Sequence, residues 1–177
     1  EKFIGNIDFI KSCAKASNEL NYCKPNIVNI NDSGYIKADE LRHPIIERLI
    51  LNKYIPNWVR LGIDLENDKL SKEDKYDDYD ENDNNINKKI NGMLLFSCNS
   101  LGKSSYMKSV GLSIILAQIG MYVPAKNFTY YPFKSILTRI IGNDNIYKGL
   151  SSFAVEMSEL RTILGLVQET RPHEVHK

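Results

Sequence analysis

Apolar residues recur at helical spacing in four segments of the chain. Their spacing of three to four residues predicts a helix over residues 3–20 and a short second helix after Pro44. Two longer helices are predicted over residues 105–119 and 153–166. Gly120 follows the third segment, as expected of a residue that ends a helix.

Shorter apolar runs predict strands between these helices. Residues 27–36 alternate around the turn cluster Asn31-Asp32-Ser33-Gly34, which favours two short strands in a hairpin. Further strands are expected at residues 93–96, 122–131 and 136–141. Strand, helix, strand, loop and helix in this order indicate an α/β fold, with a mixed sheet flanked by helices.

The short second helix is preceded by Arg42, His43 and Pro44. Pro44 disfavours helical backbone at His43 and allows a helix to begin after it. We expect the buried side of this helix to be formed by Ile45, Ile46, Leu49 and Ile50. For His43 itself, a structural hydrogen-bonding role is favoured over a catalytic one.

The predicted strand at 93–96 leads through a polar loop into Gly102, Lys103 and Ser104, where the third helix begins. An open helix N-terminus carries unpaired N–H donors and about half a positive charge. A glycine lets the backbone approach an anion closely, a lysine neutralises phosphate, and a serine hydroxyl can ligate Mg²⁺. This order of elements therefore predicts a phosphate-binding loop.

Composition limits the classes of function. At 177 residues with 42% hydrophobic side chains, the chain can build one domain with a core. Its net charge of +1 provides no overall attraction to nucleic acid or to an anionic membrane. The longest apolar stretch, residues 110–123, is too short to cross a bilayer. Cys13, Cys23 and Cys98 lack metal-like spacing, so we expect reduced thiols in an intracellular protein. The sequence does not distinguish between cellular compartments.

Residues 66–89 differ from the rest of the chain. They contain nine acidic and five basic residues and almost no aliphatic ones. Such a segment buries too little apolar surface to offset the entropy of ordering. We therefore expect a disordered insertion at about residues 66–90, as a passive solvated loop or, alternatively, as an acidic segment that docks a protein.

Six blocks along the chain, in this order, resemble one family. They are LRHPIIERL (41–49), KYIPN (53–57), CNSLGKSSYMKS (98–109), AQIGMYVPA (117–125), LTRI (137–140) and GLSSFAVEMSEL (149–160). Together they resemble the C-terminal ATPase domain of MutS-type DNA mismatch-repair proteins, over roughly residues 7–164. The resemblance implies a P-loop NTPase fold of the ABC type, with ATP and Mg²⁺ as cofactors.

On the phosphate side, the resemblance implies a role for each residue of the loop. Lys103 would contact the β- and γ-phosphates, Ser104 would ligate Mg²⁺, and Gly102 with the amides up to Ser105 would cradle the phosphates. Asn99 matches an asparagine beside the γ-phosphate. Ser97, where the family has glycine, would be strained if the backbone there requires a positive φ.

On the base side, the resemblance implies that Tyr54 stacks on adenine with Ile55 beside it. Tyrosine can replace the family's usual phenylalanine because the two rings offer the same face. Without the resemblance, the favoured interpretation is that Tyr54 and Trp58 are core aromatic residues near the edge of the sheet.

The resemblance also implies partners. Ser151 matches a serine that reaches the γ-phosphate bound by a facing second protomer, although it can equally serve as a helix N-cap. Mismatched DNA would be contacted through domains upstream of this chain. Residues 1–25 would then be the end of a helix that leads to those domains, and residues 26–177 a partial ATPase domain. The alternative for residues 1–25 is an amphipathic helix packed on the core.

Catalysis in the family depends on an Asp-Glu pair that ends an apolar strand. Residues 165–177 contain no such strand or pair, so we expect a domain that is incomplete at its C-terminus and binds ATP without hydrolysing it. Glu169, His173, Glu174 and His176 are weak substitutes for the pair. An unrelated or degenerate P-loop module, which only binds nucleotide or dimerises and has no role in mismatch repair, is the alternative.

Overall fold

The computed structural model describes residues 1–28, 34–62, 90–98, 101–139 and 152–170. The chain divides into two compact units, Glu1–Phe133 and Lys134–Lys177. The first unit contains α1 (Lys2–Glu19), β1 (Asn26–Ile27), β2 (Ile36–Leu41), α2 (Ile46–Leu49), β3 (Asn57–Leu61), α3 (Lys103–Gln118) and β4 (Asn127–Tyr130). The second unit contains α4 (Ser152–Thr170).

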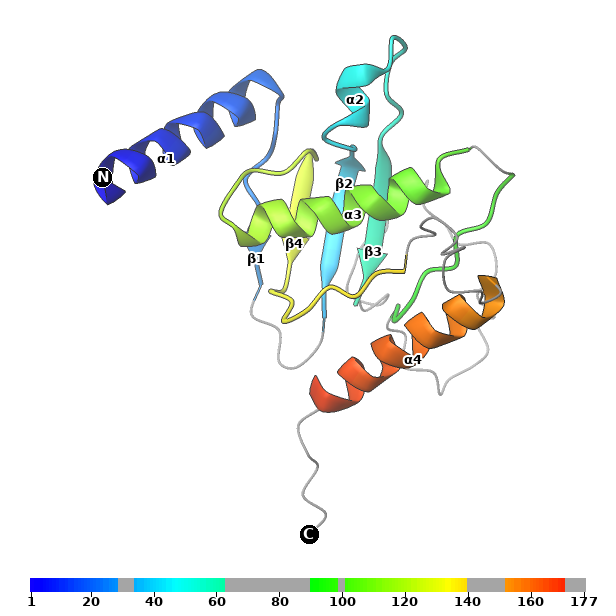
Figure 1. Cartoon of the computed structure of the whole chain (residues 1–177). Coiled ribbons are helices and arrows are strands. Elements are labelled where there is room, and N and C mark those ends of the chain that lie inside the picture. The colour runs from blue at the N-terminus through cyan, green and yellow to red at the C-terminus, as the bar shows by residue number, and fades with distance from the viewer. Residues whose placement is uncertain (29–33, 63–89, 99–100, 140–151, 171–177) are drawn as a thin grey trace, which may run out of the picture. The chain divides into compact units, whose positions relative to one another are not determined.

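The sheet of the first unit has four strands in the order β1-β4-β2-β3. β1 runs parallel to β4, whereas β2 is antiparallel to both β4 and β3. The sheet is therefore mixed, and with helix α3 crossing it (Figure 1) the predicted mixed α/β class is confirmed. All four helices expected from the spacing of apolar residues are present.

The core lies between the sheet and α3. Every second residue at the start of β2 is buried, which places Ile36 and Ala38 on the face that packs against the rest of the core. Phe128 from β4 and Ile114 from α3 join the same apolar cluster. This packing fixes the axis of α3 against the sheet, and so it fixes where α3 begins.

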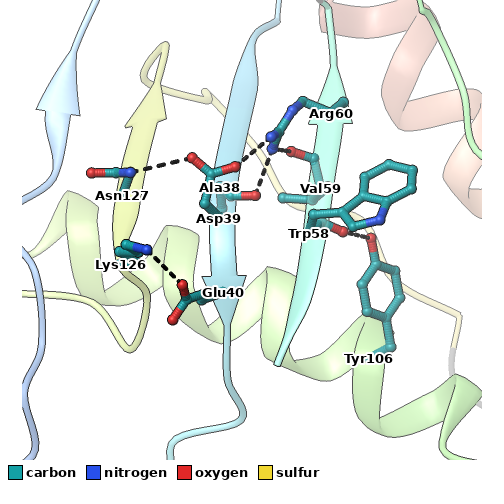
Figure 2. Close-up of polar contacts among 9 residues, drawn as sticks. All are labelled: Ala38, Asp39, Glu40, Trp58, Val59, Arg60, Tyr106, Lys126 and Asn127. Atoms are coloured by element: carbon teal, nitrogen blue, oxygen red, sulfur yellow. Dashed lines mark hydrogen bonds and ion pairs between the residues drawn. The ribbon is translucent and has the colours of Figure 1, made fainter. Parts of the chain in front are cut away.

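A buried arginine connects the edge strand β3 to its neighbour β2 (Figure 2). Arg60 on β3 donates from Nη1 to the Ala38 carbonyl oxygen at 2.7 Å and forms an ion pair with Asp39 on β2. Asn127 on β4 donates to the other oxygen of Asp39 at 3.3 Å. Three strands are thus linked through one carboxylate, which holds β3 in a fixed register beside β2.

The predicted hairpin over residues 27–36 is wrong. Strands do form at both ends of this segment, but β4 lies between β1 and β2 and takes the hydrogen bonds that a hairpin would have used. β2 also continues to Leu41 instead of ending at Ile36. The turn residues 31–33 lie outside the described residues.

The apolar run at 93–96 was expected to be a strand and is not one. No described strand pairs with it, and the adjacent edge of the sheet ends at β3. Leu94 is 88% exposed and Phe96 is 85% exposed. A buried parallel strand needs neighbours on its edges and faces, and the described part of the chain provides none here.

The sequence allowed two interpretations of α1, and the structure shows only how much of this helix is buried among the described residues. Its one buried residue is Ser17, near its end, whereas Phe3 is 75% exposed. The first turns of α1 are therefore not packed on the core formed by the described residues. Whether this helix leads to further domains remains a prediction.

In the second unit, α4 begins at Ser152, close to the predicted residue 153. The expected strand at 136–141 does not form in its described part, residues 136–139. There Arg139 instead pairs with Glu156 at 2.8 Å and with Glu159 at 3.1 Å, both on α4. The expected insertion at 66–90, apart from Ile90, and the loop at 142–151 lie outside the described residues.

Candidate functional site

A large cavity of about 960 Å³ opens in the first unit, and we call it the main pocket. One side is formed by residues 46–58, from α2 to the start of β3. The other side is formed by residues 90–97 and 101–106, which lead into α3. This one cavity is thus lined by Tyr54, Ile55 and Lys103, which were predicted to contact the two ends of one ligand.

The N-terminus of α3, where the sequence predicted phosphate binding, lines one side of the main pocket. Gly102 is its N-cap, with φ of 91° and ψ of 12°, in the left-handed region that favours glycine. The described residues provide no side-chain cap and no acidic residue in the first turn. The first N–H groups of α3 are therefore available to an anion.

Lys103 holds the loop that precedes α3. Its Nζ donates to the carbonyl oxygen of Ser97 at 2.6 Å and to that of Cys98 at 2.9 Å. An ammonium group has three donors and no acceptor, so these contacts orient it toward the loop. Phosphate oxygens entering the pocket would compete with these carbonyl oxygens for the same donors.

The remaining residues of the predicted loop are only partly described. Ser104 is exposed, and Ser105 lines the main pocket. Asn99 lies outside the described residues. Ser97 does not have a positive φ, so its Cβ causes none of the backbone strain that was considered from sequence.

Tyr54, which was predicted to stack on a base, lines the other side of the main pocket. Its ring is half-buried, and burial raises the pKa of its hydroxyl, whereas the nearby backbone of His43 acts in the opposite direction. Ile55 is exposed beside it. Tyr54 is thus a pocket wall and not a fully buried core residue, whereas its stacking on a base stays a prediction.

Tyr106 joins the two sides of the main pocket. From the first turns of α3, its hydroxyl donates to the Trp58 carbonyl oxygen of β3 at 2.9 Å (Figure 2). The sulfur of Met93 lies 3.3 Å from the same hydroxyl. The sequence marked Tyr106 only as part of a family block, because a contact across 48 positions has no local signal.

His43 is a hydrogen-bonding residue, as predicted. Its side chain is buried, and its Nδ1 accepts the backbone N–H groups of Ile45 and Ile46, each at 3.2 Å. Burial lowers the pKa of His43, which keeps the imidazole neutral and Nδ1 free to accept. The Pro44 that follows His43 was the one sequence signal for this turn.

The expected burial along α2 is wrong for three of its four isoleucine and leucine positions. Ile45, Leu49 and Ile50 are all exposed. A helix of four residues has a single turn, so it cannot present all these side chains to the core. Instead, Ile46 and Ile50 line the main pocket.

The structure does not test the remaining candidate residues. Ser151, His173, Glu174 and His176 lie outside the described residues, and Glu169 belongs to α4. No described residue that lines the main pocket carries a carboxylate. The described residues also contain no group of three His, Cys, Asp or Glu side chains placed to hold a metal ion.

Two further expectations concern the whole chain. Cys13, Cys23 and Cys98 are free cysteines. Among the described helices, none combines the length and the hydropathy needed to cross a membrane.

Comparison with known proteins gives a consistent result. The profile of MutS domain V matches residues 93–171. A mutS homolog of Acanthamoeba polyphaga mimivirus, named as a DNA mismatch repair protein, is 49% identical over 172 residues. A mitochondrial DNA mismatch repair mutS homolog of Sarcophyton glaucum is 34% identical, and the DNA mismatch repair protein MutS of Alkaliphilus oremlandii is 35% identical.

These matches cover 92% of this chain but a small share of each relative. The chain spans 15% of the mimivirus protein, 14% of the Sarcophyton protein and 16% of the Alkaliphilus protein.

Proposed function

The chain belongs to the MutS domain V family, and from that membership we propose that it is the ATP-binding part of a DNA mismatch-repair protein. The observation that carries the proposal is the main pocket, in which Tyr54 and Ile55 face the same cavity as Lys103 and the start of α3. An adenine nucleotide needs an apolar wall and a cationic, donor-rich end, and this cavity offers both.

The residues of the phosphate end fit a triphosphate. Lys103 already donates to two carbonyl oxygens, and phosphate oxygens are stronger acceptors because they are charged. At Gly102 an added Cβ would meet nothing within 4 Å, so there is room beside the first turn of α3. The amides of Lys103, Ser104 and Ser105 complete the anion-binding end.

The binding of a magnesium ion would depend on the hydroxyl of Ser104. Its hydroxyl is exposed at the start of α3, and no carboxylate lines the described pocket. Mg²⁺ often keeps several waters and is held by one or two protein ligands together with phosphate oxygens. We therefore propose that Ser104 ligates Mg²⁺ only together with the nucleotide, and that the ion neutralises phosphate charge there.

The base end is proposed to be an aromatic platform. Stacking on an aromatic ring is worth about 1 to 3 kcal/mol per base. The half-buried ring of Tyr54, which lines the main pocket, is the proposed platform. Ile46 of α2 and Ile55 supply apolar contacts around it.

The roles of the longer protein are also proposals, because this chain spans about 15% of such relatives. Residues 1–25 would end a helix leading to domains that contact mismatched DNA, and residues 26–177 would form part of an ATPase domain. Ser151 would reach the nucleotide of a facing second protomer. ATP binding and hydrolysis would then switch a DNA-bound dimer between two states.

An equilibrium titration with a fluorescent ATP analogue tests the proposal. Lys103→Ala is expected to lose most of the signal, and omission of Mg²⁺ is expected to weaken binding of the unaltered chain. Lys15→Ala is the matched control, because Lys15 is an exposed lysine of α1 that pairs only with Glu19 one turn away. Equal affinity for Lys103→Ala and Lys15→Ala would favour a degenerate or dimerisation module instead.

A further inference from the structure

One histidine contacts both parts of the base-side wall of the main pocket. His43 follows the end of β2, at Leu41, and is 5% exposed. Its Nδ1 accepts the N–H groups of Ile45 and Ile46, two donors that the start of α2 would otherwise leave unpaired. A side-chain acceptor that reaches N–H groups two and three positions ahead acts as an N-cap.

The two contacts of His43 lead to different walls of the same cavity. Through its imidazole it fixes the first turn of α2, whose Ile46 lines the main pocket, with Ile50 just beyond it. Its backbone lies beside the hydroxyl of Tyr54, on the segment leading into β3, and acts to lower the pKa of that hydroxyl. Movement of His43 would therefore displace the aliphatic wall and the aromatic wall together.

We propose that His43 is a positioning residue for the base-binding half of the main pocket, holding α2 and the Tyr54 ring at the spacing that an adenine ring requires. This inference rests on the proposed function, since it presupposes that the pocket takes an adenine nucleotide. It assigns His43 no contact with the ligand, and it leaves the phosphate end, around Lys103, independent of His43.

The role requires a neutral imidazole, because a protonated Nδ1 can no longer accept. Burial lowers the pKa of His43, and the positive charge of Lys108 on α3 acts in the same direction because it disfavours a second cation. Burial likewise raises the pKa of the Tyr54 hydroxyl, and the negative charge of Glu47 on α2 adds to that shift. The contribution of His43 is complete above its ordinary pKa of about 6.5. It is lost as the pH falls from there through the lowered pKa of the folded state.

Two variants separate positioning from general stability. His43→Ala removes the acceptor, whereas His43→Asn retains a side-chain oxygen able to cap the same N–H groups. We expect His43→Ala to bind ATP about three- to tenfold more weakly and tripolyphosphate, which has no base, with unchanged affinity. His43→Asn is expected to restore most of the ATP affinity.

A purely structural histidine gives a different result. It would lower the thermal midpoint of His43→Ala while changing ATP and tripolyphosphate affinity by the same factor, and that outcome would overturn the proposal. So would a His43→Ala chain that binds ATP like the unaltered chain. If Lys103→Ala bound both ATP and tripolyphosphate as tightly as the unaltered chain, the proposed function would be refuted instead. Failure of the positioning role and failure of the proposed function are therefore distinguishable.

A pH series covers the case in which His43→Ala does not fold. The ratio of ATP to tripolyphosphate affinity should stay constant above about pH 6.5 in the unaltered chain, fall as the pH is lowered further, and stay flat throughout in His43→Asn. The ionisation of ATP and of tripolyphosphate with pH is the same whichever chain they are mixed with. A difference between the two chains in the pH dependence of the affinity ratio therefore reports on residue 43. Parallel curves for the two chains would contradict a positioning role.

Discussion

At the scale of single residues, Gly102 combines a backbone requirement with a binding role. Its φ of 91° lies where a Cβ is strained, while the space around it is open. Gly102→Ala is therefore expected to lower the free energy of unfolding by about 1 to 2 kcal/mol, from strain alone. Urea denaturation of the unligated chain measures the change.

Gly111, in the interior of α3, provides the matched control for Gly102. Its φ is not positive, and an added Cβ would meet nothing within 4 Å beyond the helix itself. Gly111→Ala should therefore raise the free energy of unfolding by about 0.5 to 1 kcal/mol, through helix propensity. If both substitutions shift stability in the same direction, the left-handed conformation of Gly102 is wrong.

The sequence predicted some site residues and missed others for a physical reason. Lys103, which lines the main pocket, could be found because its chemistry lies in a local motif at a helix start, and Tyr54 because a family block contains it. Tyr106 and the capping role of His43 could not, because their contacts depend on distances set by the packing of α3 and the turn into α2.

At the scale of elements, helices were predicted better than strands. The helical spacing of apolar residues can be recognised within a short stretch of sequence, so α1, α3 and α4 lie close to their expected bounds. Strand pairing is decided by distant segments: β4 separates β1 from β2, and residues 93–96 have no described partner. An apolar run therefore predicted burial where Leu94 and Phe96 are exposed.

The turn that follows β3 depends on Gly62. It has φ of 73°, and an added Cβ would lie 1.8 Å from the carbonyl oxygen of Gly34, next to the start of β2. Its N–H also donates to the Ile90 carbonyl oxygen at 2.7 Å. Gly62→Ala is expected to lower the free energy of unfolding by about 2 to 5 kcal/mol, since strain and overlap with backbone add.

Chemical denaturation of Gly62→Ala beside Gly92→Ala isolates this effect. Gly92 has open space around it and no positive φ, so its substitution should change stability by less than about 0.5 kcal/mol. Equal midpoints for the two variants would show that β3 does not need the close approach of Gly62 to Gly34.

At the scale of the whole molecule, we expect ATP binding to occur without ATP hydrolysis. Phosphoryl transfer requires a group that positions the attacking water, as well as charge stabilisation. The described lining of the main pocket supplies Lys103 and helix donors but no carboxylate. We expect this chain to bind ATP and to hydrolyse it no faster than its Lys103→Ala variant.

Single-turnover hydrolysis of radiolabelled ATP at saturating protein measures this expectation. Turnover that depends on Lys103 would contradict it. It would direct attention to carboxylates that the described pocket does not include, with Glu169 and Glu174 as the first to substitute.

The central claim is that one pocket binds the two ends of one adenine nucleotide, and a single set of titrations tests it most directly. ATP and tripolyphosphate are each titrated against the unaltered chain, Tyr54→Ala and Lys103→Ala. Tyr54→Ala should weaken ATP by about 1 to 3 kcal/mol and leave tripolyphosphate unchanged, whereas Lys103→Ala should weaken both. The claim of one nucleotide pocket is contradicted if tripolyphosphate binds the unaltered chain as tightly as ATP does, or if Tyr54→Ala weakens the binding of both ligands equally.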